Sequence, residues 1–570
     1  MNRIFFFFFI FLPFTLFSYE IMPVDSVKAG MKGYGISVFG ENKLDTFDVE
    51  ILGVLEKVGP DRKVIIARLS GAGLEKTGII SGMSGSPIFI NGKIIGAAAY
   101  AWSFSIEPIT GITPIEEIIA TKIDSTEEVG GESEIKIRGE GKISPYSGVT
   151  LTRIRTPLIV SGFDDWLMKD IDDFFGERGF SIVLGGGVSG ERDAKDSLFI
   201  GSGVIAQLVG GDVLIGAIGT VTYIEGDDVF AFGHPLFFSG KTSIPMTTAY
   251  VYAIMPSQYN SFKIASGGKE VGSVLQDRRS AVYGVIGKKA HTIPLSVTVI
   301  KEKESKTFHF DIIDHKELTP FFSGITFSNA ILTQGRLYGN LTLSLEIHLK
   351  LEKYGDVKLK NFFSGEKALV LSLNNINDIL GWILNDRFER IKIKEISITT
   401  HVTEEVKTAV IETVKPGSFT VGRGGKIDLT VFLREMKGKV IKEKFTVRVP
   451  ETYTDSTVRI AIVGANGLKS LELERASNIF MAEREGQIIE LLRLAPRNNV
   501  LYCLLLSPKR GMIVKGYELG SLPSSMLHLM EDSQGFGESR FTKGGIVARM
   551  EKQCDFLVSG SSIIGLKIID

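Results

Sequence analysis

The stretch Gly78–Ala99, GIISGMSGSPIFINGKIIGAAA, decides how the rest of the chain is interpreted. Ser84 lies in its first half, within GMSGSP at positions 82–87. Glycines on both sides of a serine allow a tight turn that lifts the hydroxyl clear of the backbone, and they leave backbone N–H groups uncovered. Further along, Asn91-Gly92 separates two apolar runs, which is the strongest short signal for a β-hairpin. The stretch therefore predicts a serine on a turn that leads into a β-hairpin.

The spacing G-x-S-G-x-P is typical of chymotrypsin-like serine peptidases. It differs from the G-x-S-x-G turn of α/β-hydrolases, because position 86 is serine and not glycine. The structural alternative is a Gly/Ser-rich turn before a hairpin, which is common and carries no chemistry. The hexapeptide alone leaves both interpretations open.

Longer segments resemble the SpoIVB family of serine peptidases. Phe47–Ala99 resembles the segment that carries the nucleophile, through FDVEI at 47–51, EKTG at 75–78 and GMSGSPI at 82–88. Gly216–Leu236, GAIGTVTYIEGDDVFAFGHPL, resembles the histidine segment of that family. Val271–Gly287, VGSVLQDRRSAVYGVIG, resembles the barrel that follows the histidine. Together these blocks cover less than half of the chain.

The resemblance implies catalytic roles for particular residues. Ser84 would be the nucleophile and His234 the general base, and the backbone N–H groups of Gly82 and Ser84 would form the oxyanion hole. In the family the histidine barrel precedes the serine barrel, so the two halves are in swapped order here. A catalytic triad is defined by its geometry and not by chain order, so the swap is compatible with activity.

The acidic member of the triad is missing from its expected place. The position that matches it is Ser70, whose hydroxyl can orient an imidazole but cannot stabilise its cation as a carboxylate does. Asp227 and Asp228 are close to His234 in sequence, but we expect a solvent-exposed turn there. The third catalytic residue is therefore unassigned, with Ser70 as a candidate orienting residue.

The fold class that we predict is mainly β. It consists of two chymotrypsin-like β-barrel halves, an antiparallel β-sandwich and a small α+β C-terminal region, and the 63 glycines of the 570-residue chain fit many turns. The expected domains are a signal peptide (1–19), a Ser-bearing half (20–123), a His-bearing half (143–300), a β-rich connecting region (301–389), the sandwich (390–465) and the α+β region (466–570).

Local patterns add detail to this scheme. Apolar residues at helical spacing predict an amphipathic helix over Asp164–Phe175. Further helices are expected near residues 112–118, 375–386 and 486–494. Phe308–Glu352 alternates in a β pattern. The acidic, glycine-rich segment Asp124–Gly141 is expected to be a linker.

The N-terminus predicts export from the cell. Arg3 is followed by the apolar run Ile4–Phe17, which fits a secretory signal peptide and is short for a membrane span. We therefore expect a periplasmic or extracellular protein, with attachment to the envelope through an uncleaved anchor as the alternative. The 65 Lys and Arg against 66 Asp and Glu give a net charge of −1, which argues against nucleic acid as the main partner.

Cofactors and metals are not expected. The histidines and cysteines show no spacing typical of zinc ligands. Cys503 and Cys554 are the two cysteines of the chain. They could form one disulfide in an exported protein, and two buried free thiols are the interpretation that we favour.

Two functions of different classes remain. The first is a secreted or periplasmic SpoIVB-type serine endopeptidase that cleaves a specific protein substrate, with a cell-envelope protein as a further partner. The second is a catalytically inactive scaffold or binding protein built on a peptidase fold, which the serine at position 70 motivates. In a third hypothesis the β-sandwich is the working part of an envelope structural protein, and it predicts an exposed apolar patch within Ile391–Val449.

Overall fold

A computed structural model describes most of the chain, and it divides into two compact units, Met1–Thr292 and Ile293–Asp570. Strands account for 54% of the residues and helices for 16%, which confirms the mainly β class. The described residues are 19–59, 62–102, 105–122, 151–186, 197–334, 339–451, 453, 455–476, 480–514, 517–519, 525–526 and 539–569. The predicted signal peptide and the linker at 124–141 lie outside these ranges.

The first unit begins with a closed barrel of six strands. The hydrogen-bonded order is β4-β1-β2-β3-β6-β5, and the pairing of β4 with β5 closes the ring. A closed ring leaves no open sheet edge, and its interior is filled by buried side chains such as Phe47 and Ile51. The strands are β1 (Lys32–Gly40), β2 (Lys43–Gly59), β3 (Arg62–Ser70), β4 (Pro87–Ile90), β5 (Lys93–Trp102) and β6 (Ile109–Pro114), with β7 (Leu151–Arg153) beside β5 and short helices η1 (Val24–Ser26), α1 (Leu74–Thr77) and α2 (Ile115–Ile119).

The predicted hairpin after the serine is confirmed. Ile90 of β4 pairs with Lys93 of β5, so Asn91 and Gly92 alone form the turn. Their φ angles are +50° and +75°. A two-residue turn of this kind requires positive φ at both positions, which glycine adopts freely and asparagine better than most residues.

A second closed barrel of six strands completes the first unit. Its order is β10-β13-β14-β15-β12-β11, and the pairing of β10 with β11 closes it. Helix α3 (Asp165–Phe175) begins after Asp164, whose side chain accepts a hydrogen bond from the backbone of Trp166, which confirms the predicted amphipathic helix. The strands are β10 (Gly203–Gly211), β11 (Leu214–Glu225), β12 (Asp228–Ala231), β13 (Gly240–Met255), β14 (Phe262–Asp277) and β15 (Val282–Ile286), extended beyond β11 by β8 (Thr156–Ser161) and β9 (Phe180–Leu184), with η2 (Gly176–Arg178) after α3.

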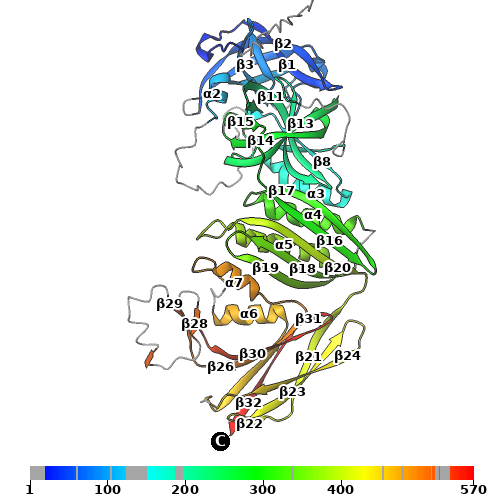
Figure 1. The fold of residues 1–570 in the computed structure, drawn as a ribbon, viewed down its shortest axis with the longest axis vertical. Coiled ribbons are helices and arrows are strands. Elements are labelled where there is room, and N and C mark those ends of the chain that lie inside the picture. Colours follow the sequence, from blue (N-terminus) through cyan, green and yellow to red (C-terminus); the bar gives the residue numbers. More distant parts are fainter. Residues whose placement is uncertain are drawn as a thin grey trace, which may run out of the picture. The chain divides into compact units, whose positions relative to one another are not determined.

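The two barrels have the same strand order. If the strands of each barrel are numbered one to six along the chain, both rings run 1-2-3-6-5-4. Figure 1 shows these strands in the blue to green part of the ribbon. The predicted pair of barrel halves is therefore present, and each barrel has an equivalent connection between its third and fourth strands.

The second unit begins with a mixed β-sheet, in which some neighbouring strands are antiparallel and others parallel, and helices pack against it. Strands β19-β18-β20-β16-β17 lie in that order, and helix α5 (Ala368–Leu384) packs on β18 and β19. The β pattern predicted over Phe308–Glu352 is wrong at its centre, where helix α4 (Leu318–Leu332) is almost entirely buried. Because α4 carries apolar or small side chains all around, it has no polar face that would have shown helical spacing. The strands are β16 (Thr292–Lys301), β17 (Glu304–Ile313), β18 (Leu341–Leu351), β19 (Gly355–Gly365) and β20 (Ile393–Thr403).

A β-sandwich follows as predicted, but it is not purely antiparallel, because β31 pairs in parallel with β21 and β32 in parallel with β22. Sheets β24-β23-β21-β31 and β22-β32-β25-β26-β30 share one core. Strands of the sandwich come both from the range 390–465 and from the range 466–570, while the finer domain boundaries remain predictions. The strands are β21 (Thr408–Pro416), β22 (Thr420–Gly422), β23 (Lys426–Glu435), β24 (Val440–Arg448), β25 (Thr457–Val463), β26 (Val500–Ser507), β30 (Gly545–Gln553), β31 (Leu557–Ser559) and β32 (Ser561–Ile569).

Both cysteines are buried in this core as free thiols, as the favoured interpretation predicted. Burial in apolar surroundings raises the pKa of Cys503 to about 12 and that of Cys554 to about 11. The thiolate is the reactive form of cysteine, so both side chains are inert packing groups at neutral pH.

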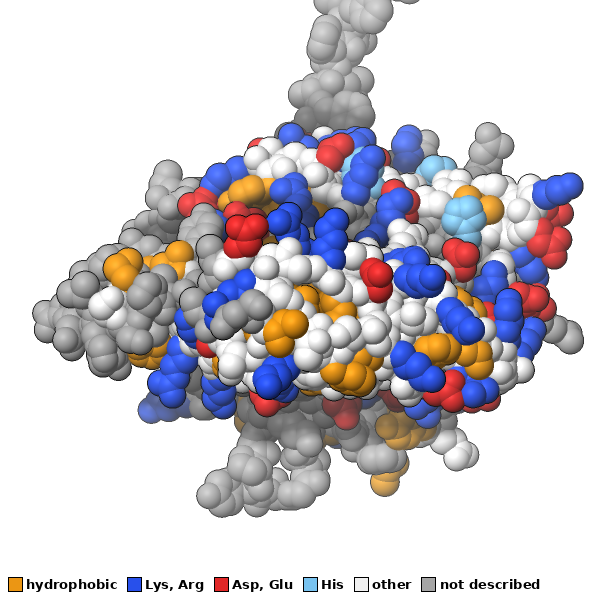
Figure 2. Space-filling view, turned by 90° about the horizontal axis from the view of Figure 1, so that it is seen from below, with side chains coloured by type: hydrophobic (Ala, Val, Ile, Leu, Met, Phe, Trp, Pro, Cys, Tyr) orange, Lys and Arg blue, Asp and Glu red, His pale blue; other side chains and the backbone are white. Residues whose placement is uncertain are grey.

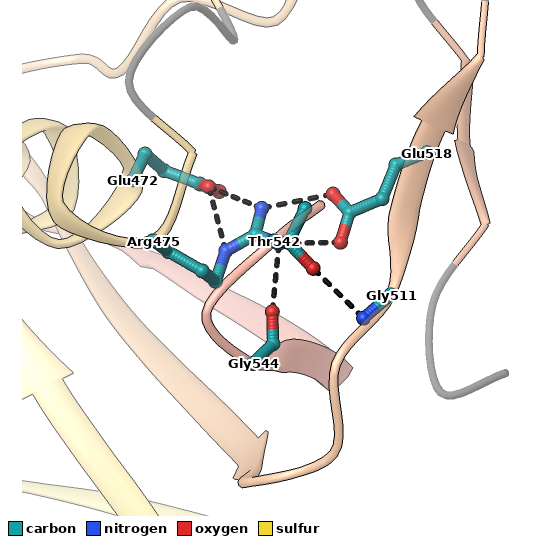
Figure 3. Close-up of polar contacts among 6 residues, drawn as sticks. All are labelled: Glu472, Arg475, Gly511, Glu518, Thr542 and Gly544. Atoms are coloured by element: carbon teal, nitrogen blue, oxygen red, sulfur yellow. Dashed lines mark hydrogen bonds and ion pairs between the residues drawn. The ribbon is translucent and has the colours of Figure 1, made fainter. Parts of the chain in front are cut away.

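A buried arginine forms hydrogen bonds to three segments in the C-terminal part of the chain (Figure 3). Arg475, the last residue of α6 (Ala465–Arg475), donates to Glu472 one turn earlier, to Glu518 and to the carbonyl of Gly544. Its planar guanidinium supplies five donors, so one cation satisfies two carboxylates and a carbonyl. Glu518 lies on β28 (Tyr517–Leu519), which pairs with β27 (Met512–Val514), and β29 (Ser539–Phe541) and α7 (Gln487–Arg493) complete the unit. We assign this cluster a structural role.

The surface carries charges of both signs. On the face in Figure 2, Lys and Arg side chains are interspersed with Asp and Glu, and hydrophobic side chains gather in small groups. Exposed large hydrophobic residues between 391 and 449 are Val410, Phe419, Met436 and Val440. In the described ranges, no helix combines the length and apolarity that crossing a membrane requires.

Candidate active site

Ser84 lies in the connection between the third and fourth strands of the first barrel. The turn closes through a hydrogen bond from Ser86 N to Met83 O of 2.9 Å. Gly82 and Gly85 have φ angles of +93° and +92°, in the region that favours glycine. The glycines around the serine thus adopt the tight-turn backbone conformation that the sequence predicted.

The serine turn packs directly against the second barrel. A Cβ atom on Gly85 would lie 2.1 Å from Thr220 O and 2.5 Å from Phe232 N, so no larger residue fits there. Thr220 N donates to Ser84 O at 2.9 Å, and Thr222 Oγ1 donates to Gly85 O at 2.8 Å. Strand β11 of the second barrel therefore holds the backbone carbonyls of Ser84 and Gly85.

His234 lies in the equivalent connection of the second barrel, between its third and fourth strands. The carbonyl of Gly233 accepts a hydrogen bond from Thr113 Oγ1 of the first barrel at 2.7 Å. Phe232, two residues before His234, is the residue that Gly85 touches. The fold thus brings the serine loop and the histidine loop into contact, although 150 positions separate Ser84 from His234 in the sequence.

The imidazole of His234 is buried and neutral. Its Nδ1 lies 2.9 Å from Pro235 O, and because a carbonyl only accepts, Nδ1 carries the proton and Nε2 presents a lone pair. Burial, and secondly the charge of Arg153, lower the pKa of His234 to about 3. Neutral Nε2 is the form that a general base requires.

Two reactive atoms lack partners in the described part of the chain. Ser84 is 0% exposed and His234 2%, and neither Ser84 Oγ nor His234 Nε2 makes a hydrogen bond there. A buried polar atom without a partner costs about 1–3 kcal/mol. Such atoms are rare in native proteins and often mark a functional site.

The backbone donors expected to form the oxyanion hole are also uncommitted. Within the described ranges, the N–H groups of Gly82 and Ser84 donate to no carbonyl or side chain. Ser70, the candidate orienting residue, ends β3 and is paired with Asp48 of β2. No hydrogen bond of the described chain links it to His234. Asp228 is bound by Lys122 at 2.6 Å and by Tyr283 at 2.7 Å.

Sequence reasoning missed a buried carboxylate behind the histidine loop. Asp277, at the end of β14, accepts hydrogen bonds from Leu236 N at 2.8 Å, Phe237 N at 2.7 Å and Ser239 N at 3.2 Å. Burial raises the pKa of Asp277, and these backbone donors oppose the rise. Asp277 lies within the block at 271–287 that resembles the family, so an acidic residue in that apolar strand was an available signal.

Two cations also escaped the sequence analysis, the half-buried Arg153 and the fully buried Lys263. Arg153 Nη1 donates to Pro235 O at 2.9 Å, beside His234. Lys263 is 0% exposed and lies on the serine side of the site. The sequence feature that could have predicted the burial of Lys263 is the alternation of side chains along β14, which places Lys263 on the same buried face as Ala265. In the described residues, no group of three or more His, Cys, Asp or Glu side chains could hold a metal ion.

The two barrels share one strand order, and their equivalent loops, which carry Ser84 and His234, are in contact. Residues 17–112 match the family model described as SpoIVB peptidase S55. The match confirms the resemblance over the serine-bearing barrel and supports a serine peptidase. No curated protein and no solved structure matches the chain.

Proposed function

We propose that this protein is a serine endopeptidase of the SpoIVB type, with Ser84 as nucleophile and His234 as general base. The observation that carries the proposal is the pair of buried, unpartnered atoms, Ser84 Oγ and His234 Nε2, on loops in contact. The match at residues 17–112 supports it independently. We also propose that the protein is exported through its N-terminal segment and acts on a specific protein in the cell envelope.

In the proposed reaction, Ser84 Oγ attacks the carbonyl carbon of the scissile peptide while His234 Nε2 takes its proton. The carbonyl oxygen becomes an oxyanion and accepts hydrogen bonds from the N–H groups of Gly82 and Ser84. His234 then donates the proton to the leaving amine, and water releases the acyl group by the reverse sequence.

The orienting role falls to a backbone carbonyl in this proposal. Pro235 O holds the Nδ1 proton of His234, and Arg153 and Asp277 fix the loop on which Pro235 lies. Ser70 remains a candidate for this role, without a contact that supports it. Because burial, and secondly Arg153, disfavour the imidazolium that forms during acylation, we expect a slow enzyme in this state of the site.

The site is closed in the state described here. A protein substrate cannot reach a serine that is 0% exposed, so segments that cover Ser84 must move before cleavage. We infer that the covering segments open transiently, which admits a small molecule, whereas a protein substrate must itself hold the site open, which agrees with a narrow choice of target.

The test is labelling of the purified mature protein with a small fluorophosphonate, followed by peptide mapping. We expect the label on Ser84, and its loss in Ser84→Ala and in His234→Ala. Ser81→Ala, which removes a neighbouring hydroxyl bonded to Asn260, is the matched control and retains the label. Folded wild-type protein that stays unlabelled would contradict the proposal.

The alternative function is an inactive scaffold or binding protein. The burial of both reactive side chains and the serine at position 70 favour it. In that case the fluorophosphonate leaves Ser84 unmodified, and affinity capture from an envelope fraction gives the same binding partner with wild type and with Ser84→Ala.

A further inference from the structure

Lys263 lies beneath the serine turn without a counter-charge among its hydrogen-bond partners. Its Nζ donates to two hydroxyl groups, Ser37 Oγ at 3.1 Å and Thr220 Oγ1 at 3.2 Å. Its methylene groups pack on Gly82, where a Cβ atom would lie 3.2 Å from Lys263 Cδ. Placing a lysine at 0% exposure is unfavourable, so its retention beside the reactive serine requires an explanation.

Each of these hydroxyl groups is connected by hydrogen bonds to a carbonyl of the serine turn, either directly or through one further hydroxyl. Thr220 Oγ1 donates to Gly82 O at 3.0 Å. Ser37 Oγ lies 3.0 Å from Ser86 Oγ, which donates to Met83 O at 2.6 Å. Because Ser86 has a single hydroxyl hydrogen, its bond to Met83 O makes it the acceptor from Ser37. Two chains of donors therefore run from the Lys263 side chain to the serine turn.

The Met83 carbonyl determines where one of the oxyanion-hole donors points. A trans peptide unit is planar, with its C=O and N–H on opposite sides. Holding Met83 O therefore fixes the direction of Ser84 N–H, which belongs to the same peptide unit. The backbone N–H of Lys263 donates to Ser81 O at 3.2 Å, which fixes Gly82 N–H in the same way. One residue thus controls both proposed donors.

We propose that Lys263 is the positioning residue of the oxyanion hole, acting on the Ser84 amide through Ser37 and Ser86 and on the Gly82 amide through its own backbone. This inference rests on the proposed function. It assigns Lys263 no contact with the reacting atoms, since no hydrogen bond joins its Nζ to Ser84 Oγ in the described residues.

The protonation state of Lys263 does not break the relay. Burial lowers its pKa to about 7. An ammonium group has three donors and a neutral amine has two, so either form can supply both Ser37 and Thr220. Methionine, which has a similar length and no donor, removes the relay and preserves most of the packing.

The experiment compares Lys263→Met with wild type in fluorophosphonate labelling of Ser84. The limiting rate of phosphonylation and the half-saturating probe concentration are measured separately. We expect the limiting rate to fall roughly 10- to 100-fold, because loss of a single oxyanion donor costs about 10²–10³ in rate. The half-saturating concentration should stay within about twofold. The ³¹P chemical shift of the Ser84 adduct should move, because the phosphonyl oxygen loses aligned donors.

Control variants separate the relay from general stability. Lys241→Met changes an exposed lysine of the same barrel and should label like wild type. Ser37→Ala cuts the path to Met83 O while keeping the lysine, and it should reproduce the rate loss and the shift. This variant decides the question if Lys263→Met does not fold.

The outcomes distinguish the two proposals. Wild type that labels, together with Lys263→Met and Ser37→Ala that label equally fast, overturns the positioning role and leaves the peptidase intact. A slower variant whose adduct keeps the wild-type ³¹P shift also overturns the positioning role. Wild type that does not label contradicts the proposed function, and the positioning role falls with it.

Discussion

The two barrels share a strand order but differ in what they bring to the site. The serine loop of the first barrel contains glycines and hydroxyl groups, with Gly82 and Gly85 at positive φ. The second barrel carries the buried charged groups Lys263 and Asp277 and the histidine. The proposed nucleophile thus stands on a turn shaped by backbone freedom, while the proposed general base and the buried charged groups come from the other barrel.

This difference shows how a glycine-rich turn can be made rigid. Glycine permits the conformation but does not fix it, because it has many accessible backbone states. The fixing comes from the second barrel, through Thr220, Thr222 and Lys263. The predictions that follow test this division between the barrels, beginning with the largest expected effect.

Removing the histidine should have the largest effect on chemistry. We expect His234→Ala to lower the rate of Ser84 labelling about 10³-fold, because general-base catalysis contributes about 10²–10⁴. With a pKa of about 3, His234 is neutral above pH 5, so the wild-type rate should lack a titration of this residue near pH 6.5. His291→Ala, in an exposed position of the same unit, is the control. If the wild-type labelling rate falls as the pH drops through about 6.5, and His234→Ala abolishes that fall, the expected neutral state of His234 is contradicted.

Filling the contact between the barrels should strongly destabilise the first unit. Gly85→Ala places a Cβ atom 2.1 Å from Thr220 O at a φ of +92°. We expect a loss of about 3 kcal/mol in the free energy of unfolding, from overpacking and backbone strain together. Denaturant titration measures it.

The matched control is Gly92→Ala in the hairpin turn. Its φ is +75°, but nothing lies within 4 Å of the added Cβ. It should lose only about 1 kcal/mol, from backbone strain. Equal losses in the two variants would show that the contact between the barrels contributes nothing.

Weakening the anchor of the histidine loop should have an intermediate effect. Asp277→Asn replaces one acceptor oxygen by a donor facing the backbone N–H groups of residues 236–239. We expect a loss of about 2 kcal/mol in stability and roughly tenfold slower labelling of Ser84. Asp227→Asn, at an exposed position, should change neither. If Asp277→Asn unfolds more slowly than wild type, the role of Asp277 as an anchor of the histidine loop is contradicted.

The smallest effect, taken per pH unit, concerns the pH dependence of stability. The pKa of Lys263 falls from 10.5 to about 7 on folding, so between these values the unfolded chain binds more protons than the folded chain. Stability therefore rises with pH across this window, by at most about 1.4 kcal/mol per pH unit. Lys263→Met should lack this contribution. Chemical denaturation of both proteins from pH 7 to pH 9.5 measures the difference, and parallel curves would mean that Lys263 stays protonated throughout.

Local signals were enough to predict the serine turn and many strands, while the resemblance to the SpoIVB family implied the two barrels. Asn91-Gly92 determined a hairpin through backbone sterics alone, and alternating apolar residues indicated the strands. Helix α4 was missed because a helix buried on all sides has no periodic polar face. Lys263 could not be assigned, because its partner Ser37 lies 226 positions away and neither residue stands in a recognisable motif.

The contact between the serine turn and β11 has a consequence for inheritance. The segment with a recognisable ancestry, residues 17–112, ends before Thr220, Lys263 and His234. Copied alone into another gene, it would bring a nucleophile whose supporting hydrogen bonds had been left behind. The pair of barrels is therefore the smallest piece of this chain that contains the serine turn together with the groups that hold it, and a matching serine segment in another protein need not have those groups.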